Sequence, residues 1–141
     1  MGLSTGRRAG AGVTVAVIDS GIHPSAAFAG RIAAFFDFTR AGVTPSQPYD
    51  DYGHGTHIAG LIGGRQQAED QAVQGVAPLV RLVGMKVLDA SGRGRTSDVI
   101  RALEFAVANR RGLGIDIINL SLGHPIFEAA ATDPLVRAVE N

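Results

Sequence analysis

The sequence predicts an α/β fold: a three-layer arrangement in which a parallel sheet lies between helices on both faces. Two observations carry the prediction. Short β-branched runs and segments of helical spacing follow one another in the order strand, strand, helix, strand, helix, strand, helix. The strands are also nearly continuous in apolar residues, as strands covered on both faces are. A chain of 141 residues with 45% hydrophobic residues fits one globular domain.

The first half of the chain contains three predicted elements. Residues 13–18 predict a buried strand, because a β-branched run is bounded by glycines and an Asp-Ser-Gly turn. Residues 32–38 predict a second strand of mixed burial, and residues 39–53, with two prolines, predict a loop. Residues 55–63 are small and apolar enough for a buried helix, and their glycines imply close packing.

The second half repeats strand and helix after a polar segment, residues 65–74, that predicts a surface loop. Turn and cap residues separate the elements. The predictions are a strand over 80–88, a flexible turn over 92–95, a helix capped by Thr96 or Ser97 and stopped by Gly112, a strand over 115–120, and a helix begun by Asp133 and Pro134. Because the sequence stops inside that last helix, we expect a sheet truncated after its N-terminal half, with an unpaired edge and an uncovered apolar face.

Composition excludes several classes of function. Thirteen basic residues balance thirteen acidic ones, so charge does not favour nucleic acid or an anionic membrane as a partner. The absence of cysteine removes disulfides, thiolate metal sites and cysteine nucleophiles. Residues 1–12 lack the apolar stretch of a signal peptide, and no apolar run approaches the roughly 20 residues that span a bilayer. The sequence predicts a soluble protein.

Asp19 follows the first predicted strand directly. Functional groups in open α/β sheets gather beyond the carboxyl ends of the strands, which makes Asp19 a candidate. The alternative is that Asp19 and Ser20 only satisfy backbone donors in a turn. Asp50 and Asp51 are loop carboxylates, either solvated or directed at basic substrate residues.

Two histidines lie at the start of the predicted buried helix, His54 at its mouth and His57 one turn further in. They allow three interpretations. In the first interpretation both histidines are structural. In the second they bind a metal, but a zinc site needs three or four ligands and no third ligand is adjacent. In the third interpretation one imidazole is a general base and Asp19 fixes its tautomer. The residues alone leave these alternatives open.

Five ordered blocks of the sequence resemble the successive signatures of subtilisin-like serine peptidases. These blocks are residues 15–22 (VAVIDSGI), 50–60 (DDYGHGTHIAG), 75–78 (GVAP), 86–88 (KVL) and 118–123 (INLSLG). Five matches in order are far more specific than any single one. We therefore expect residues 12–141 to be a partial subtilisin-like peptidase domain, lacking the part with the serine, after an N-terminal extension over residues 1–11.

The resemblance implies a role for particular residues. It makes Asp19 the orienting acid and His54 the general base, and it makes His57 structural, in keeping with a deeper position. Leu88, Gly92 and Gly94 resemble one edge of the substrate cleft, and Ser121, Leu122 and Gly123 the facing edge. An extended peptide can add a strand between two such segments, so the partner implied is a polypeptide substrate.

Other parts of the family pattern are missing. The sequence has no Gly-Thr-Ser-Met-Ala block for the nucleophile, no Ala-Gly-Asn block for the oxyanion and no inhibitory pro-segment. None of the seven serines has the required context: Ser4, Ser20, Ser25, Ser46, Ser91, Ser97 and Ser121. We therefore expect the missing C-terminal half of the domain to be a partner, and this chain by itself to be inactive.

Family resemblance also makes calcium possible as a cofactor and suggests a secreted or extracytoplasmic protein. Calcium takes about six to eight oxygen ligands, and residues 65–74 offer only Glu69 and Asp70 as carboxylates, so the sequence does not support a calcium site. It predicts no metal and no other cofactor.

Three hypotheses follow from the sequence. The first is a serine endopeptidase to which this chain contributes the acid, the base and part of the cleft. The second is a non-catalytic peptide-binding protein that kept the cleft without the serine. The third and weakest is a metal protein using His54 and His57.

Overall fold

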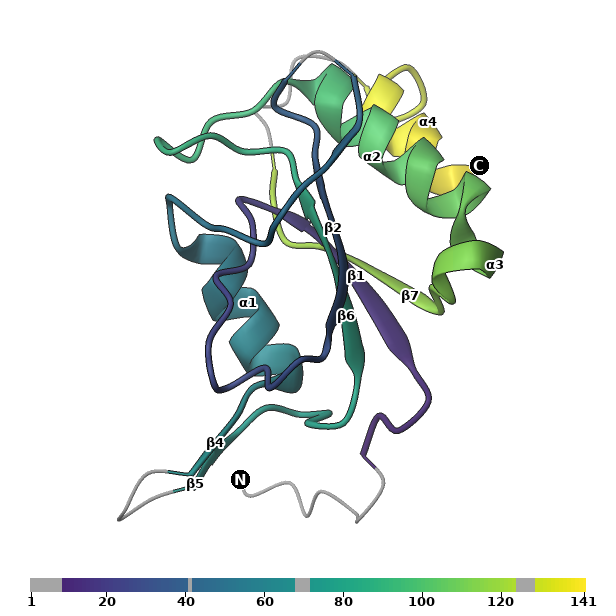
Figure 1. The fold of residues 1–141 in the computed structure, drawn as a ribbon. Helices are drawn as coiled ribbons and strands as arrows, with labels where there is room; N and C mark the ends of the chain where they lie inside the picture. Colours follow the sequence, from purple (N-terminus) through teal and green to yellow (C-terminus); the bar gives the residue numbers. More distant parts are fainter. Residues whose placement is uncertain (1–8, 41, 68–71, 124–128) are drawn as a thin grey trace.

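A computed structural model describes residues 9–40, 42–67, 72–123 and 129–141 as a five-stranded sheet with helices on both sides and a separate two-stranded hairpin (Figure 1). The five-stranded sheet has the order β3-β2-β6-β1-β7. Its strands are β1 (Thr14–Asp19), β2 (Ile32–Asp37), β3 (Thr44–Pro45), β6 (Arg81–Lys86) and β7 (Ile117–Leu120). The helices are α1 (His54–Gly63), α2 (Thr96–Ala108), α3 (Arg110–Leu113) and α4 (Pro134–Glu140). No helix among these residues is long and apolar enough to cross a bilayer.

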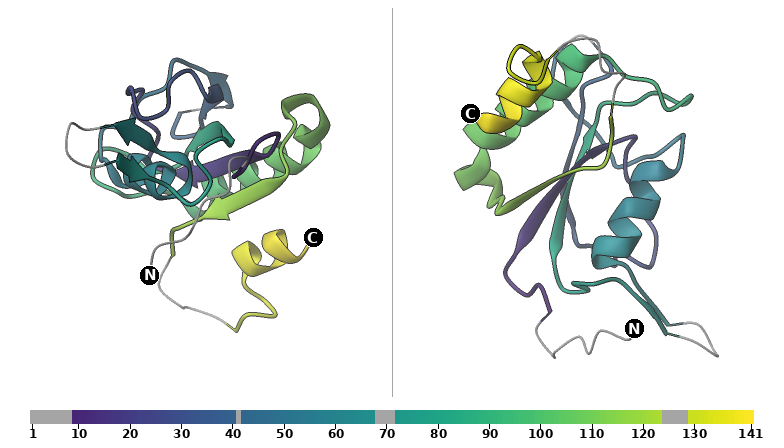
Figure 2. Two further views of the ribbon diagram at one scale, coloured as in Figure 1. Left: turned by 90° about the horizontal axis from the view of Figure 1, so that it is seen from below. Right: turned by 180° about the vertical axis from the view of Figure 1, so that it is seen from behind.

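Strand β1 shows how the three layers form, because its side chains alternate between the two faces of the sheet. Val15 and Val17 belong to a buried cluster with Ala59 of α1. Ala16 and Ile18 belong to a second cluster, which contains residues of α2 and α4. Figure 1 and the right-hand view of Figure 2 show α1 on one side of the sheet and α2 with α4 on the other. The predicted three-layer α/β fold is confirmed.

The sheet is parallel except at one edge. β2, β6, β1 and β7 run parallel to their neighbours, whereas β3 pairs antiparallel with β2. The strand β3 lies in the segment that the sequence predicts as loop. The predicted surface loop over residues 65–74 is also wrong in part, because β4 (Arg65–Gln67) and β5 (Ala72–Gln74) form an antiparallel hairpin. Such pairing uses backbone groups and needs no apolar residues.

Two predicted helix boundaries are wrong, and one is confirmed. Thr96 and Ser97 are the first residues of α2 rather than its cap; the N-cap position is Arg95, which makes no side-chain cap bond. After a break at Asn109 the chain forms α3 and stops at Gly114, with φ 66°, instead of at Gly112. Of these two glycines, Gly114 has the left-handed conformation that ends a helix, and Gly112 does not. Helix α4 begins at Pro134 as predicted, after the Asp133 side chain, which accepts from two backbone N–H groups.

An uncovered apolar face lies beside β7, as the sequence leads us to expect. β7 pairs with β1, and among the described residues it has no partner on its other side. Leu61, Val76 and Ile117 are each more than half exposed. Together with Val15 of β1 and other residues they line an apolar hollow of about 530 Å³.

The parallel strands bring several sequence-distant residues to one edge of the sheet. β1 ends at Asp19, β6 at Lys86 and β7 at Leu120. Lys86 lies between two acids, because its backbone is in register with Asp19 on one side and with Asp37 on the other. The candidate functional site lies at this edge.

Candidate active site

Asp19 and His54 are in direct contact. The Nδ1 atom of His54 lies 2.8 Å from one carboxylate oxygen of Asp19 and 2.9 Å from the other. Asp19, the last residue of β1, is fully buried, whereas 42% of the His54 side chain is exposed. A buried carboxylate on Nδ1 fixes the imidazole tautomer and orientation, and stabilises the ring when it gains a proton. The arrangement can therefore support general-base chemistry at Nε2.

Gly55 allows α1 to approach the acid this closely. A Cβ atom at Gly55 would lie 2.2 Å from the carbonyl oxygen of Gly21 and 3.0 Å from the Cβ of Asp19. Any side chain at that position would push α1, and His54 with it, away from the turn after β1. The close packing that the glycines predict is confirmed at this point.

Asp50 holds the start of α1 where the N-cap position, Gly53, has no side chain. Its carboxylate accepts from the Gly53 N–H at 2.8 Å, the Thr56 N–H at 2.9 Å and the Ser20 hydroxyl at 2.9 Å. Ser20 in turn accepts from the Gly55 N–H at 2.9 Å. Burial raises the pKa of Asp50, but hydrogen bonds from Thr56, Gly53 and Ser20 outweigh it and bring the pKa down to about 2. Asp50 therefore connects the turn after Asp19 to the helix that begins at His54.

Asp51 binds Lys86, with 2.6 Å between its Oδ1 and the lysine Nζ. Because both loop carboxylates have partners inside the protein, the structure does not support the hypothesis that they attract basic substrate residues. The roles of Asp50 and Lys86 were missed by sequence reasoning. One signal was available: Lys86 is the only lysine in a sequence with twelve arginines, and it ends an apolar strand.

His57 lies at the surface, so the deeper position expected for it is wrong. The buried face of α1 is formed by Gly55, Ala59 and Gly63, and His57 is not on that face. It lines a surface hollow of about 400 Å³ instead. Its structural role stays a prediction.

The described residues do not form a metal site. They contain no group of three or more histidine, cysteine, aspartate or glutamate side chains placed to hold an ion. His54 already uses Nδ1 for Asp19. Glu69 and Asp70, the carboxylates considered for calcium, lie outside the described residues. The part of the chain that the structure describes thus offers no cluster of carboxylates for the calcium that the family resemblance makes possible.

Residues of the two predicted cleft edges line the same hollow of about 350 Å³. Leu88, Gly92 and Gly94 come from one edge, and Leu122 and Gly123 from the other. Its remaining lining is mixed, with the apolar Val99 and Leu135 and the polar Arg93, Arg95 and Thr96. Ser121 is not among the lining residues, and its hydroxyl donates to Asn119 at 2.9 Å. Residues 124–128, which follow this edge, lie outside the described residues.

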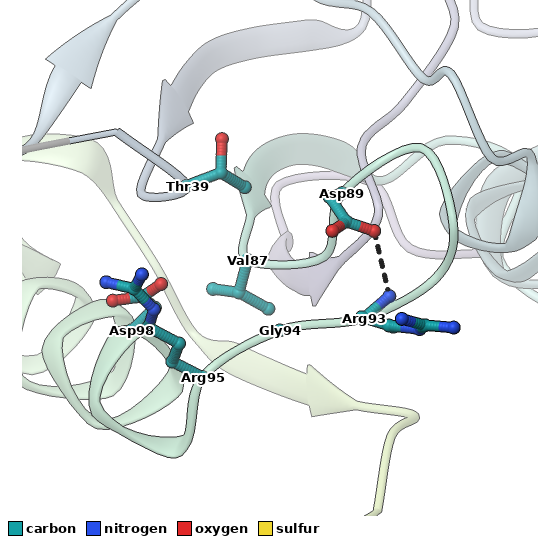
Figure 3. A pocket seen from close by; sticks show the side chains of 7 residues that line it. All are labelled: Thr39, Val87, Asp89, Arg93, Gly94, Arg95 and Asp98. Carbon is teal, nitrogen blue, oxygen red and sulfur yellow. Dashed lines mark hydrogen bonds between the residues drawn. The ribbon is translucent and has the colours of Figure 1, made fainter.

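The first cleft edge is a loop held by Asp89. One oxygen of Asp89 accepts from the Ser91 N–H at 2.8 Å, the Ser91 hydroxyl at 2.7 Å and the Arg93 N–H at 3.0 Å, the last drawn in Figure 3. These hydrogen bonds lower the pKa of Asp89. The same loop lines a second hollow of about 240 Å³, with Thr39 and Val87 facing it (Figure 3).

Known proteins resemble this chain over most of its length. The model of the subtilase family matches residues 10–141. The chain is 40% identical over 136 residues to serine protease AprX of Bacillus subtilis (strain 168), covering 93% of this chain and 30% of AprX. It is 42% identical over 130 residues to alkaline serine exoprotease A of Vibrio alginolyticus, covering 92% of this chain and 22% of that protein.

Solved structures give the same result. The structure of sphericase matches with a TM-score of 0.80 and 30% identity, over 94% of this chain and 42% of that one. The chain therefore spans less than a third of the length of the two curated relatives and under half of the sphericase chain. Since the family match covers nearly every residue and the fold agrees with it, this chain belongs to the subtilase family of serine peptidases.

Proposed function

We propose that the protein is a serine endopeptidase in which this chain supplies the acid, Asp19, and the general base, His54. The contact between His54 Nδ1 and the buried Asp19 carboxylate, at 2.8 and 2.9 Å, carries the proposal. With Nδ1 bound, Nε2 is the nitrogen left to take a proton from a nucleophilic hydroxyl.

The reaction splits peptide hydrolysis into two steps. In the first, a serine hydroxyl attacks the substrate carbonyl as His54 takes its proton, and His54 then gives that proton to the leaving amine. In the second, water attacks the acyl-enzyme with His54 again as base, and the serine leaves with the proton. Asp19 stabilises the imidazolium that forms in both steps.

The nucleophile of this proposal lies outside the 141 residues. No serine of the sequence lies in a Gly-Thr-Ser-Met-Ala context. The two serines of the resembling blocks are engaged elsewhere, Ser20 with Asp50 and Ser121 with Asn119. The chain by itself is therefore expected to be inactive, with residues 12–141 as one part of the peptidase domain.

The substrate is a polypeptide bound in extended form between the two cleft edges. Gly123 on one edge leaves room for a peptide backbone, because a Cβ atom there would meet nothing within 4 Å, whereas Gly92 and Gly94 on the other edge let that loop pack against Tyr52 and Val87. The apolar part of the hollow's lining gives a substrate side chain a place to bind.

Peptide hydrolysis by the full-length protein tests the proposal. His54→Ala is expected to lower kcat by about 10⁶-fold, the loss that removing the histidine causes in subtilisin itself. His23→Ala is the matched control, because His23 is also exposed and near α1, yet its side chain has no part in the site. Activity that survives His54→Ala would refute the proposal.

The preformed cleft favours one second candidate, a peptide-binding protein without catalysis. Its lining residues come together without any serine block. Reading the gene beyond the codon for Asn141 separates the two candidates. A Gly-Thr-Ser-type block in frame supports the peptidase, and a continuation without one supports the binding protein.

A further inference from the structure

Lys86 is unusual in both sequence and structure. It is the only lysine among 141 residues that include twelve arginines. It is the last residue of β6, and only 1% of it is exposed. Because a buried charge is costly unless it is fully paired, its surroundings must compensate for it.

The ammonium group of Lys86 is surrounded by acceptors. Its Nζ lies 2.6 Å from the carbonyl oxygen of Ser20, 2.6 Å from the carbonyl oxygen of Leu88 and 2.6 Å from Oδ1 of Asp51. An ammonium has three N–H donors, so each has one acceptor. The ring of Tyr49 adds a further contact, with its centre 5.1 Å from Nζ.

Those three acceptors belong to the three parts of the proposed site. Ser20 follows the acid, Asp19, directly. Asp51 lies three residues before the base, His54. Leu88 belongs to the cleft edge. One ammonium group therefore joins the turn of the acid, the loop that leads to the base and the edge that contacts substrate.

We propose that Lys86 is a positioning residue that keeps the acid, the base and the cleft edge in one fixed arrangement. It touches neither the reacting atoms nor the substrate. The inference rests on the proposed peptidase function, because only a reaction makes that arrangement matter. A displacement of about 1 Å between reacting groups can lower a rate by about 100-fold.

The geometry also explains why this position carries lysine in an arginine-rich sequence. Three acceptors converge on one atom, which suits the compact ammonium at the end of a slender stem. The guanidinium of arginine is planar, spreads its five donors over a fork and needs more room. Arginine should therefore fail to replace Lys86 although it keeps the charge.

The test compares Lys86→Met and Lys86→Arg with the unaltered full-length protein in peptide hydrolysis. Methionine matches the length of the stem and removes all three hydrogen bonds. Active-site titration with a serine-directed inhibitor counts the folded, competent molecules, so that kcat refers to these alone. We expect kcat to fall by about 100-fold for Lys86→Met. We expect KM to rise as well, because the carbonyl oxygen of Leu88 loses its hydrogen bond from Lys86. Lys86→Arg should not restore either value.

A spectroscopic measurement reports on the arrangement itself. The Nδ1 proton of His54, held by Asp19, gives a proton resonance whose position and exchange rate depend on that hydrogen bond. Lys86→Met should shift or broaden this resonance, whereas a loss of stability alone would leave it unchanged in the molecules that remain folded. A Lys86→Met protein with the wild-type resonance and kcat and KM within twofold would overturn the proposal.

If Lys86→Met yields no folded protein, the Asp51→Ala variant tests the proposed positioning role of Lys86 instead. The Asp51 side chain is 43% exposed, so its removal leaves the apolar core intact; it takes one of the three acceptors from Lys86 and frees the loop before His54. The matched control is Asp116→Ala, an exposed carboxylate at the opposite end of the sheet. We expect kcat to fall several-fold for Asp51→Ala alone; equal kinetics of the two variants would overturn the proposal. If the unaltered protein and its His54→Ala variant hydrolyse peptide equally, the proposed function fails instead.

Discussion

The proposed acid–base corner, formed by Asp19, His54 and the residues that hold them, and the proposed substrate cleft lie at the same edge of the sheet, but they are held in different ways. In the corner, side chains make the connections, with the partly buried Asp50 joining Ser20 to α1 and the buried Lys86 joining three segments. In the cleft, backbone and glycines form the edges, and a single exposed carboxylate, Asp89, holds one loop. Changes in the corner should therefore affect the rate of the reaction, and changes in the cleft should affect substrate binding.

Among the variants that test this comparison, the largest effect is expected from Asp19→Asn in the full-length protein. An amide can donate to Nδ1 and hold the wrong tautomer of His54, so kcat should fall by about 10⁴-fold. KM should stay within about twofold, because no cleft residue changes. Steady-state kinetics with a peptide substrate measure both values, and Asp116→Asn serves as the control. A change mainly in KM would contradict the expectation that the corner affects the reaction rate and the cleft affects substrate binding.

The next effect is expected from Gly55→Ala, which tests the close approach of α1 to the acid. The added methyl group would meet the Gly21 carbonyl, and we expect it to lower the free energy of unfolding by about 1–3 kcal/mol and to reduce kcat. Gly60→Ala is the matched control in the same helix, since its Cβ would meet nothing within 4 Å.

Unfolding in urea, in a His54→Ala background that prevents self-digestion, measures the stability difference. Gly60→Ala should raise the free energy of unfolding by about 0.5–1 kcal/mol, because alanine favours the helix. Equal stability of the two variants would show that α1 does not press against the acid's turn.

Asp50 should make stability depend on pH in acid. Its pKa in the folded protein is about 2, below the ordinary value of 3.8, so the unfolded chain takes up the proton first. The stabilisation is therefore complete above about pH 5, and it is lost as the pH falls towards 2. We expect a contribution of about 1–2 kcal/mol, reduced by partial exposure.

The free energy of unfolding, measured between pH 5 and 2.5 in the His54→Ala background, checks this prediction. Asp50→Asn should be less stable at pH 5 and should show a flatter pH dependence than its parent. Parallel curves for the two proteins would mean that Asp50 does not tie the corner together.

The smallest effect is expected in the cleft. A Cβ atom at Gly94 would lie 2.5 Å from the carbonyl oxygen of Val87, so Gly94→Ala should shift the cleft edge. We expect KM to rise about fivefold, equivalent to about 1 kcal/mol, with kcat nearly unchanged. Gly112→Ala, where a Cβ would meet nothing within 4 Å, is the control. A fall in kcat without a change in KM would mean that this cleft edge affects the reaction rate, as the corner is expected to, and not substrate binding.

Much of this site could be predicted from the sequence because its main residues have local signatures. Asp19 ends an apolar strand and His54 begins a helix of small residues, so parallel topology brings both to one edge. Leu88 and Leu122, the residues proposed for the cleft, follow β6 and β7, the two strands that pair with β1. Strand ends can be read from short stretches of sequence, and the topology then places them together.

Other features could not be predicted, because they depend on which of several equivalent residues meets a distant partner. Gly112 and Gly114 are equally good helix stops in sequence, and only the turn into β7 selects Gly114. His57 resembles a buried residue until the face of α1 that meets the sheet is known. Asp50 and Asp51 are adjacent loop acids, yet one binds Ser20 and the other Lys86.

The sequence by itself thus determined the three-layer α/β fold, the family and the aspartate–histidine pair, since periodicity and ordered motifs are properties of the chain. Only the tertiary structure decided how that pair is held. The network around Lys86 joins residues 20, 51, 86 and 88, which come from separate segments and carry no common pattern. A buried ammonium selects its acceptors by distance in the folded protein, and this distance follows from the packing of the whole sheet.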